Sequence, residues 1–136
     1  MYTYSTEIRV RYADTDQMGF VYHGNFLIYY EVARTEALRN LGIAYKDLEV
    51  SGVMMPVLDF YCKFYKPARY DDILTVKVSI PLFPGVKIHF NYEVYNQKQE
   101  LINTGNTILV FLNKETERPV RMPENMKKVL DPYYDR

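Results

Sequence analysis

Residues 12–39 read YADTDQMGFVYHGNFLIYYEVARTEALR, and the rest of the chain is organised around them. Two carboxylates, Asp14 and Asp16, stand in the opening loop, and His23 follows them. Apolar residues then recur at steps of three and four positions, which is the spacing of one face of an α-helix. The pattern predicts a long helix that ends near Gly42, since glycine commonly terminates helices.

The expected start of this helix, at Gly24-Asn25, could take part in binding or catalysis. The N–H groups of a first helical turn have no partner within the helix, and the positive end of the macrodipole lies there. Backbone N–H groups around His23 and Gly24 could therefore hold a developing oxyanion. Asp16 could act as general base or as nucleophile, and His23 could bond a substrate carbonyl or orient water. On chemistry alone, the more common role for both aspartates is that of turn residues that bond nearby backbone N–H groups, which accounts for most loop aspartates.

Composition excludes several classes of protein. Seventeen basic and 17 acidic residues cancel, which removes the general attraction to phosphate backbones and argues against a nucleic-acid partner. The length of 136 residues predicts a single domain over 1–136. Cys62 is the only cysteine, so no intramolecular disulfide is expected and a reducing compartment is favoured. No apolar stretch is long enough for a signal core or a membrane span, so we expect a cytoplasmic protein.

Alternation of polar and apolar residues predicts strands on both sides of the helix. The first would cover residues 7–12, with Ile8, Val10 and Tyr12 facing inward. Four further strands joined by short turns should follow, with a short helical turn before them and a closing helix after them. The expected ranges are 45–50 and 124–130 for these helices, and 60–65, 73–80, 86–95 and 101–112 for the strands. Such a sheet leaves its edges exposed, and pairing of sheets between subunits is the common remedy.

Other reactive side chains receive ordinary roles. Cys62 alternates with phenylalanines, which predicts a buried, inert thiol. Glu31 and Arg34 lie one helical turn apart, and we expect them to form a surface or interface pair. His89 falls on the polar face of its strand and should be solvated. The chain has no nucleophile elbow, no nucleotide-binding glycine pattern and no metal-ligand set, so neither a metal nor a cofactor is expected.

Residues 12–27 closely resemble the 4-hydroxybenzoyl-CoA thioesterase-like family of hotdog-fold proteins, in particular its bacterial short-chain acyl-CoA thioesterase branch. That branch is marked by the segment Tyr-x-Asp-Thr-Asp-x-x-Gly-x-Val-Tyr-His, followed by a helix start of Asn, an aromatic residue and Leu. A second, shorter match covers residues 64–72, FYKPARYDD, at the family's strand-to-strand turn. The resemblance extends to about Asn113. It implies an α+β hotdog fold, in which a five-stranded antiparallel sheet wraps around one long central helix.

The resemblance also implies a function, which is hydrolysis of the thioester of a short-chain or aromatic acyl-CoA. Asp16 would be the catalytic carboxylate, and the backbone N–H of His23 would polarise the thioester carbonyl, whereas Asp14 keeps its structural role. Further substrate contacts are expected from four residues, Tyr22, Gly24, Lys66 and Lys87. Some relatives carry a basic cluster for the CoA phosphates where this chain has residues 84–87, PGVK, so the sequence does not specify how the nucleotide is held.

Two other classes of function stay open at this point. A hotdog dehydratase would also use a carboxylate and a histidine, but on a 3-hydroxyacyl chain. A non-catalytic acyl-CoA-binding or scaffold protein would need no proton transfer, and the presence of both Asp16 and His23 argues against that role. The resemblance further implies a homo-oligomer, either a dimer or a dimer of dimers.

Overall fold

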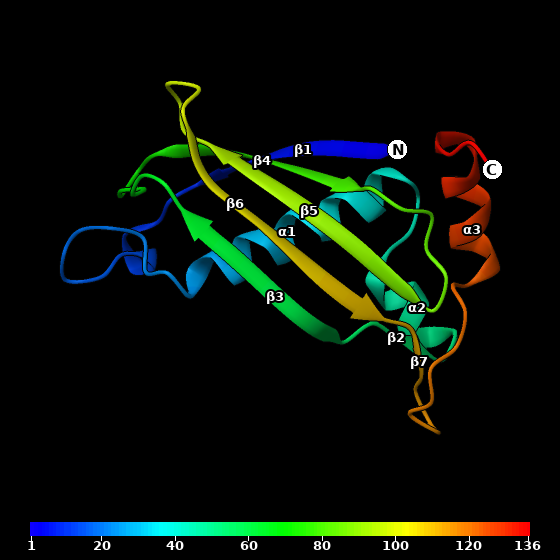
Figure 1. Ribbon diagram of the computed structural model, residues 1–136. Helices are drawn as coiled ribbons and strands as arrows, with labels where there is room; N and C mark the ends of the chain where they lie inside the picture. Colours follow the sequence, from blue (N-terminus) through cyan, green and yellow to red (C-terminus); the bar gives the residue numbers. More distant parts are fainter.

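The protein is described by a computed structural model that covers residues 1–136. Five antiparallel strands form one sheet in the order β1-β4-β5-β6-β3 (Figure 1), and their bounds are β1 Tyr2–Arg9, β3 Val57–Phe64, β4 Ile73–Ile80, β5 Lys87–Tyr95 and β6 Leu101–Val110. A small second sheet pairs β2 Val53–Met54 with β7 Leu112–Asn113. The helices are α1 Asn25–Asn40, α2 Tyr45–Val50 and α3 Glu124–Leu130, with 3-10 turns at Tyr12–Asp14 and Asp131–Tyr133.

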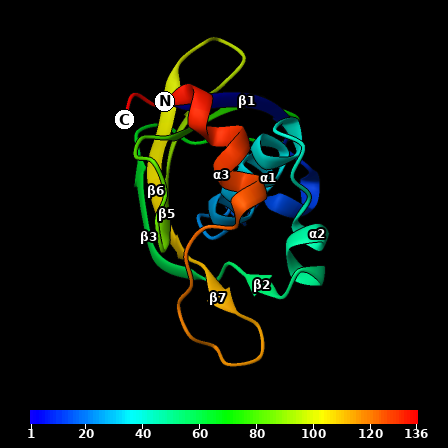
Figure 2. The same ribbon diagram turned by 90° about the vertical axis from the view of Figure 1, so that its right-hand side faces the viewer.

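Helix α1 lies inside the curve of the sheet, as Figure 2 shows in a view near the helix axis. Tyr30, Ala33 and Ala37 are fully buried against the strands, because they share the apolar face that the sequence predicts. The helix ends at Asn40, and Gly42 has the positive φ of 86° that favours glycine. The predicted α+β hotdog architecture is confirmed. No helix is both long and apolar enough to cross a lipid bilayer.

The first strand lies earlier than the sequence pattern predicted. It covers Tyr2–Arg9 and pairs along its full length with β4, whereas residues 7–12 were expected. Tyr12 is 77% exposed, so the prediction that it faces inward is wrong. The chain leaves the sheet after Arg9 because a 3-10 helix follows at Tyr12–Asp14, and the N–H of Arg11, just before this helix, donates to the Asp14 carboxylate (3.0 Å). The alternating pattern of the strand therefore extends toward the N-terminus, through Tyr2 and Tyr4.

Arg34 is buried, and the expected pair with Glu31 is absent. Its side chain is 5% exposed and continues the sheet-facing side of α1, with Nη1 at 3.5 Å from the hydroxyl of Tyr92. Burial acts to lower the pKa of Arg34, but the phenol groups of Tyr92 and Tyr45 outweigh this effect and raise it. The guanidinium therefore stays charged, and its Nε has no hydrogen-bond partner. The i,i+3 spacing of Glu31 and Arg34 predicted a surface pair, but Arg34 lies on the sheet-facing side of α1 and is therefore buried.

Strand β3 forms one edge of the sheet and pairs only with β6. Phe60 and Phe64 point toward α1 but stay 40% and 49% exposed, since no further strand covers them. Cys62, between them, is half-buried, so the expectation of a buried thiol is wrong. Its Sγ accepts a hydrogen bond from Asn103 Nδ2 (3.0 Å). The apolar alternation identified the inner face of this strand correctly, but it could not show that the strand is an edge.

One contact sets the distance between helix and sheet. The ring of Tyr30 stacks on that of Tyr92, with centroids 4.0 Å apart and planes 3° from parallel, and its hydroxyl donates to Asn103 Oδ1. The ring lies directly against the backbone of β6 at Gly105. A Cβ on Gly105 would lie 2.6 Å from the carbonyl oxygen of Tyr61 and closer still to the Tyr30 hydroxyl. Only glycine at this position lets the helix approach the sheet so closely.

We expect Gly105→Ala to lower the free energy of unfolding by roughly 1–3 kcal/mol, the usual effect of overpacking a filled core. The added methyl group must displace the Tyr30 ring or the backbone of β3. Gly85→Ala is the matched control, because its Cβ would meet no atom within 4 Å, and it should change stability by less than about 0.5 kcal/mol. Urea unfolding of both variants measures the difference. Equal midpoints would contradict the claim that Tyr30 is held in place.

Candidate active site

Asp16 stands at the tip of a tight turn. Its backbone N–H donates to the carbonyl of Phe20 (2.8 Å), and the N–H of Gly19 donates back to its carbonyl (3.0 Å). Gly19 has φ of 79°, which this turn requires. Asp16 Oδ1 accepts the N–H groups of Met18 (2.9 Å) and Phe20 (3.3 Å), whereas Oδ2 accepts no hydrogen bond from the protein. The carboxylate is therefore held through one oxygen, and the other is free for a reacting molecule.

Asp14 is the other aspartate of the motif, and it is buried. Its carboxylate accepts the N–H of Arg11 (3.0 Å), the hydroxyl of Tyr29 (2.9 Å) and the Arg11 guanidinium (3.1 Å). Burial alone would raise the pKa of Asp14, but these hydrogen bonds and the Arg11 charge outweigh it and lower the pKa. Its carbonyl accepts Asn25 Nδ2 (2.7 Å) and the N–H of Tyr22 (2.9 Å). Asp14 thus ties the loop to the start of α1.

The start of α1 leaves two backbone donors free. The N–H groups of His23 and Gly24 donate to no group of the protein, whereas that of Asn25 donates to Tyr22 (2.9 Å). The Tyr22 ring lies over this turn, and a Cβ on Gly24 would lie 2.8 Å from its Cε2 atom. The centroids of the Tyr22 and His23 rings are 4.3 Å apart. Free N–H groups at a helix N-terminus are suited to bind an anion or a polarised oxygen.

A cavity of about 300 Å³ lies between this loop and the end of β3. Three of the predicted site residues line it together, namely Asp16, His23 and Lys66. The rest of the wall is apolar or aromatic and consists of Met18, Phe20, Val21, Phe26, Phe64, Tyr65, Pro67 and Ala68. Figure 1 shows how this arises, since the loop before α1 and the turn after β3 lie at the same end of the molecule. A carboxylate, an imidazole and an ammonium group therefore share a mainly apolar cavity.

The remaining predicted residues lie outside the cavity wall. Tyr22 and Gly24 adjoin His23 at its border. Lys87 begins β5 opposite Val110, whereas the site adjoins the other end of the sheet, where Tyr95 pairs with Leu101. Within one chain, Lys87 is thus separated from Asp16 by the length of β5.

Two partners of the site were missed in the sequence. Tyr29 binds Asp14, and its position one turn after Phe26 on the apolar face of α1 was the available signal. Glu100 pairs with Lys66 from a hairpin 34 residues away. No local sequence pattern predicts that contact.

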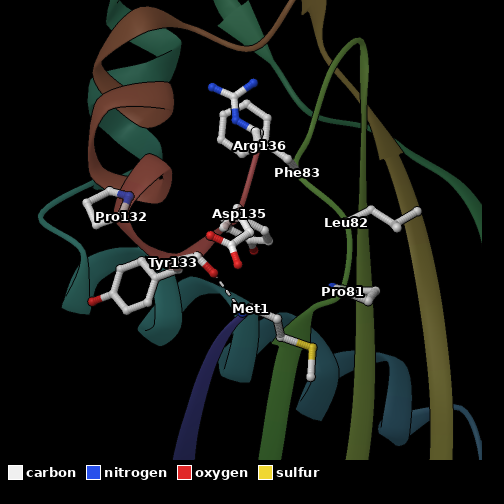
Figure 3. A pocket seen from close by; sticks show the side chains of 9 residues that line it. Met1, Pro81, Leu82, Phe83, Pro132, Tyr133, Asp135 and Arg136 are labelled. Atoms are coloured by element: carbon white, nitrogen blue, oxygen red, sulfur yellow. Dashed lines mark hydrogen bonds between the residues drawn. The ribbon is translucent and has the colours of Figure 1, made fainter.

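A larger hollow of about 580 Å³ lies between the two ends of the chain (Figure 3). Its two cationic groups are already engaged, because the amine of Met1 donates to the carbonyl of Tyr133 (2.7 Å) and the Arg136 guanidinium lies 3.7 Å from the centroid of the Phe83 ring. One carboxylate, that of Asp135, lines it, but no histidine does. It therefore lacks the combination of carboxylate and imidazole that the smaller cavity has. Nowhere does the structure gather three His, Cys, Asp or Glu side chains that could hold a metal ion.

Comparison with known proteins agrees with this geometry. The family model of the thioesterase-like superfamily matches residues 10–130. The chain is 38% identical to YneP of Bacillus subtilis over 121 residues, covering 89% of this chain and 88% of that protein. It is 31% identical to the acyl-CoA thioester hydrolase YbgC of Escherichia coli over 119 residues, covering 88% and 89%. A DHNA-CoA thioesterase structure from Staphylococcus aureus has a TM-score of 0.89 at 34% identity, covering 98% of this chain and 95% of that one. The chain therefore belongs to the thioesterase-like superfamily of hotdog-fold proteins.

Proposed function

We propose that this protein, as one catalytic domain over residues 1–136, hydrolyses a short-chain or aromatic acyl-CoA to the free acid and CoA. One observation carries the proposal. The free Oδ2 of Asp16 and the unpaired N–H groups of His23 and Gly24 belong to one loop beside a single apolar cavity. These are the base or nucleophile and the oxyanion donors that thioester hydrolysis needs.

The chemistry follows from these positions. As general base, Asp16 takes a proton from water while the water oxygen bonds to the thioester carbonyl carbon. The carbonyl oxygen becomes negative, and the N–H groups of His23 and Gly24 stabilise it. The carbon–sulfur bond then breaks, and the CoA sulfur leaves with the proton. As nucleophile, the Asp16 carboxylate would instead bond to the carbonyl carbon and expel the CoA thiolate, which forms a mixed anhydride that water hydrolyses in a second step.

The cavity favours a small or flat acyl group. Its volume of about 300 Å³ is at the lower end of typical ligand pockets. Phe20, Phe26 and Phe64 contribute aromatic surface, and the rings of Phe26 and Phe64 meet edge to face at 5.3 Å. A short aliphatic chain or one aromatic ring would fill the space.

We further propose that two chains pair through β3, and that two such dimers form the tetramer expected from family resemblance. The strand offers unpaired backbone groups along one side and exposed apolar residues, including Leu58 and Phe60. Antiparallel pairing across a two-fold axis would bring the Lys87 end of one chain toward the Asp16 end of the other. Lys87 could then assist substrate binding in the partner's site. A CoA substrate and a single free cysteine both suit a cytoplasmic enzyme.

Asp16→Asn keeps the size of the side chain and removes its charge. We expect kcat/KM for acyl-CoA hydrolysis to fall by roughly 10²–10⁴, with the free energy of unfolding little changed. A thiol-trapping dye measures the released CoA. Hydrolysis at the wild-type rate by folded Asp16→Asn protein would show that another group is the base.

Asp14→Asn is the matched control and should mainly reduce stability. Because the folded pKa of Asp14 is lowered, its contribution is present above its unfolded pKa of about 3.9 and is lost as the pH falls through the folded value. The variant should therefore unfold more easily near neutral pH, and its stability should depend less on pH below about 4. Chemical unfolding as a function of pH measures this. Equal stability of the two proteins at pH 7 would contradict the structural role.

The backbone of His23 and its side chain can be tested separately. His23→Ala keeps the N–H and should leave measurable hydrolysis, whereas Asp16→Ala should leave almost none. Gly24 has φ of −64°, which proline can adopt, so Gly24→Pro removes one N–H with little change in φ. We expect Gly24→Pro to lose roughly 10²–10³ in kcat relative to Gly24→Ala, which adds a Cβ but keeps the donor. Equal rates for these two variants, both folded, would refute the oxyanion role of that N–H.

Light scattering at micromolar concentration should give the mass of two or four chains of 16.2 kDa. Leu58→Lys places a charge on the exposed face of β3 and should shift the protein toward the monomer, because a buried unpaired charge is costly. Val50→Lys in α2, at an apolar position with 88% exposure, should leave the mass unchanged. A fully active monomeric wild type would contradict the proposed assembly.

A further inference from the structure

Lys66 is the only lysine or arginine in the wall of the Asp16 cavity. Its backbone is fixed, since the N–H groups of Tyr65 and Lys66 both donate to the carbonyl of Ile102 (2.9 and 3.2 Å), and Pro67 follows. Its side chain is 52% exposed, so the ammonium group can reach solvent as well as the cavity mouth. The fixed backbone and the exposed side chain place a cation in the cavity wall where it is accessible from solvent.

Glu100 forms an ion pair with this ammonium group in the structure. It lies after the β5–β6 hairpin, which Figure 1 shows at the same end of the sheet as the cavity loop, and its Oε2 pairs with Lys66 Nζ. Its Oε1 accepts Asn96 Nδ2 (2.9 Å), and Asn96 Oδ1 accepts the N–H groups of Lys98 and Glu100 (both 3.0 Å). The hydrogen bond from Lys66 is the main reason that the pKa of Glu100 is lowered. The hairpin therefore presents a preformed carboxylate to the lysine.

The hairpin is also attached to the turn that follows the cavity wall. Gln97 Oε1 accepts the N–H of Ile73 (3.2 Å), and Gln97 Nε2 donates to Asp72 Oδ1 (3.1 Å). These contacts keep Glu100 beside Lys66 without requiring the ion pair itself. The pair can open while the hairpin stays in place.

The other cations near the cavity are engaged differently. The Arg69 guanidinium lies over the Phe20 ring, 5.1 Å from its centroid, and Arg11 is bound to Asp14. Lys66 differs because its partner is an exposed carboxylate, and exposed ion pairs contribute little to stability. The 3′-phosphate of CoA, and its diphosphate taken as a whole, each carry about two negative charges against one for a carboxylate, and both form strong charge-assisted hydrogen bonds with lysine. A phosphate can therefore displace Glu100 from Lys66.

We propose that Lys66 binds a phosphate group of the CoA portion of the substrate, and that Glu100 is a displaceable partner that holds the ammonium in position until then. This inference rests on the function proposed above. Within one chain, it assigns the nucleotide contact to the turn after β3, because the chain lacks a basic cluster at residues 84–87 and its own Lys87 lies at the other end of the sheet. Glu100 then weakens ground-state binding of CoA by competing for the same cation.

The test compares thioesters of one acyl group on CoA, on 3′-dephospho-CoA and on pantetheine, which lacks the nucleotide and all of the phosphates. Lys66→Met keeps an unbranched apolar stem and removes the charge. We expect the ratio of kcat/KM for acyl-CoA to that for acyl-pantetheine to fall about tenfold in this variant. Glu100→Gln keeps an acceptor for Asn96 and should lower KM for acyl-CoA about twofold to threefold. Lys114→Met, at an exposed lysine without an ion pair, is the control and should leave the ratio unchanged.

The outcomes separate this inference from the proposed function. An unchanged ratio in Lys66→Met, or a raised KM for acyl-CoA in Glu100→Gln, would overturn the phosphate contact while leaving the thioesterase intact. If Lys66→Met does not change kcat/KM for the 3′-dephospho-CoA thioester, the 3′-phosphate is the bound group. If kcat/KM for that thioester still falls, the diphosphate is the bound group. Calorimetric binding of free CoA to wild type and Lys66→Met repeats the comparison without turnover. If the wild type binds CoA through Lys66 but hydrolyses no thioester, the proposed enzymatic activity is refuted and the phosphate contact stands. If wild type and Lys66→Met bind CoA with equal affinity, the phosphate contact is refuted.

Discussion

The stacking of Tyr30 between α1 and the sheet is the contact on which the rest of the structure depends. Its ring lies on Tyr92 of β5 and against the bare backbone of Gly105 in β6, and its hydroxyl reaches Asn103. Two strands and one helix are therefore held at one distance by one side chain. Because α1 is rigid, this contact also sets where its first turn lies. The free N–H groups of His23 and Gly24 stand at the start of this helix.

The two aspartates of the loop have different roles because Asp14 is buried and Asp16 is only half-buried. Asp14 uses its carboxylate and carbonyl on Arg11, Tyr29 and Asn25, so it has little capacity left for a substrate. Asp16 is bound only by turn N–H groups on one oxygen. Such a turn can hold a carboxylate near a helix start without burying it. The buried member stabilises the loop, and the accessible member is placed to react.

Two features of the single chain have unsatisfied polar groups, the edge strand β3 and the buried Arg34. The strand has a free backbone edge with exposed phenylalanines, and the guanidinium has no carboxylate partner although it is 5% exposed. Buried charges are costly unless other groups satisfy them, and here two phenol groups supply part of that compensation. Pairing of two chains along β3 would cover the free edge of this strand.

The sequence by itself determined the local elements and the identity of the loop. Apolar spacing located α1, alternation located β4 and β5, and the motif from Tyr12 to Leu27 identified the family and the two aspartates. These features follow from rules of short range, since helix faces, strand faces and turns depend on neighbours in the chain. The same rules misplaced the first strand, since the alternation between Glu7 and Tyr12 continues past the point where the chain leaves the sheet.

Only the tertiary structure decided which distant groups meet. The spacing of Glu31 and Arg34 could not show that α1 turns Arg34 toward Tyr92, and the alternation around Cys62 could not show that β3 has only one neighbour. Lys66 and Asp16 line one cavity because the turn after β3 lies beside the loop before α1, and Lys66 meets Glu100 because the end of β3 lies beside the start of β6. Lys87 lies at the other end of the sheet for the same geometric reason. Contacts between residues far apart in sequence depend on the path of the whole chain, and no local pattern encodes that path.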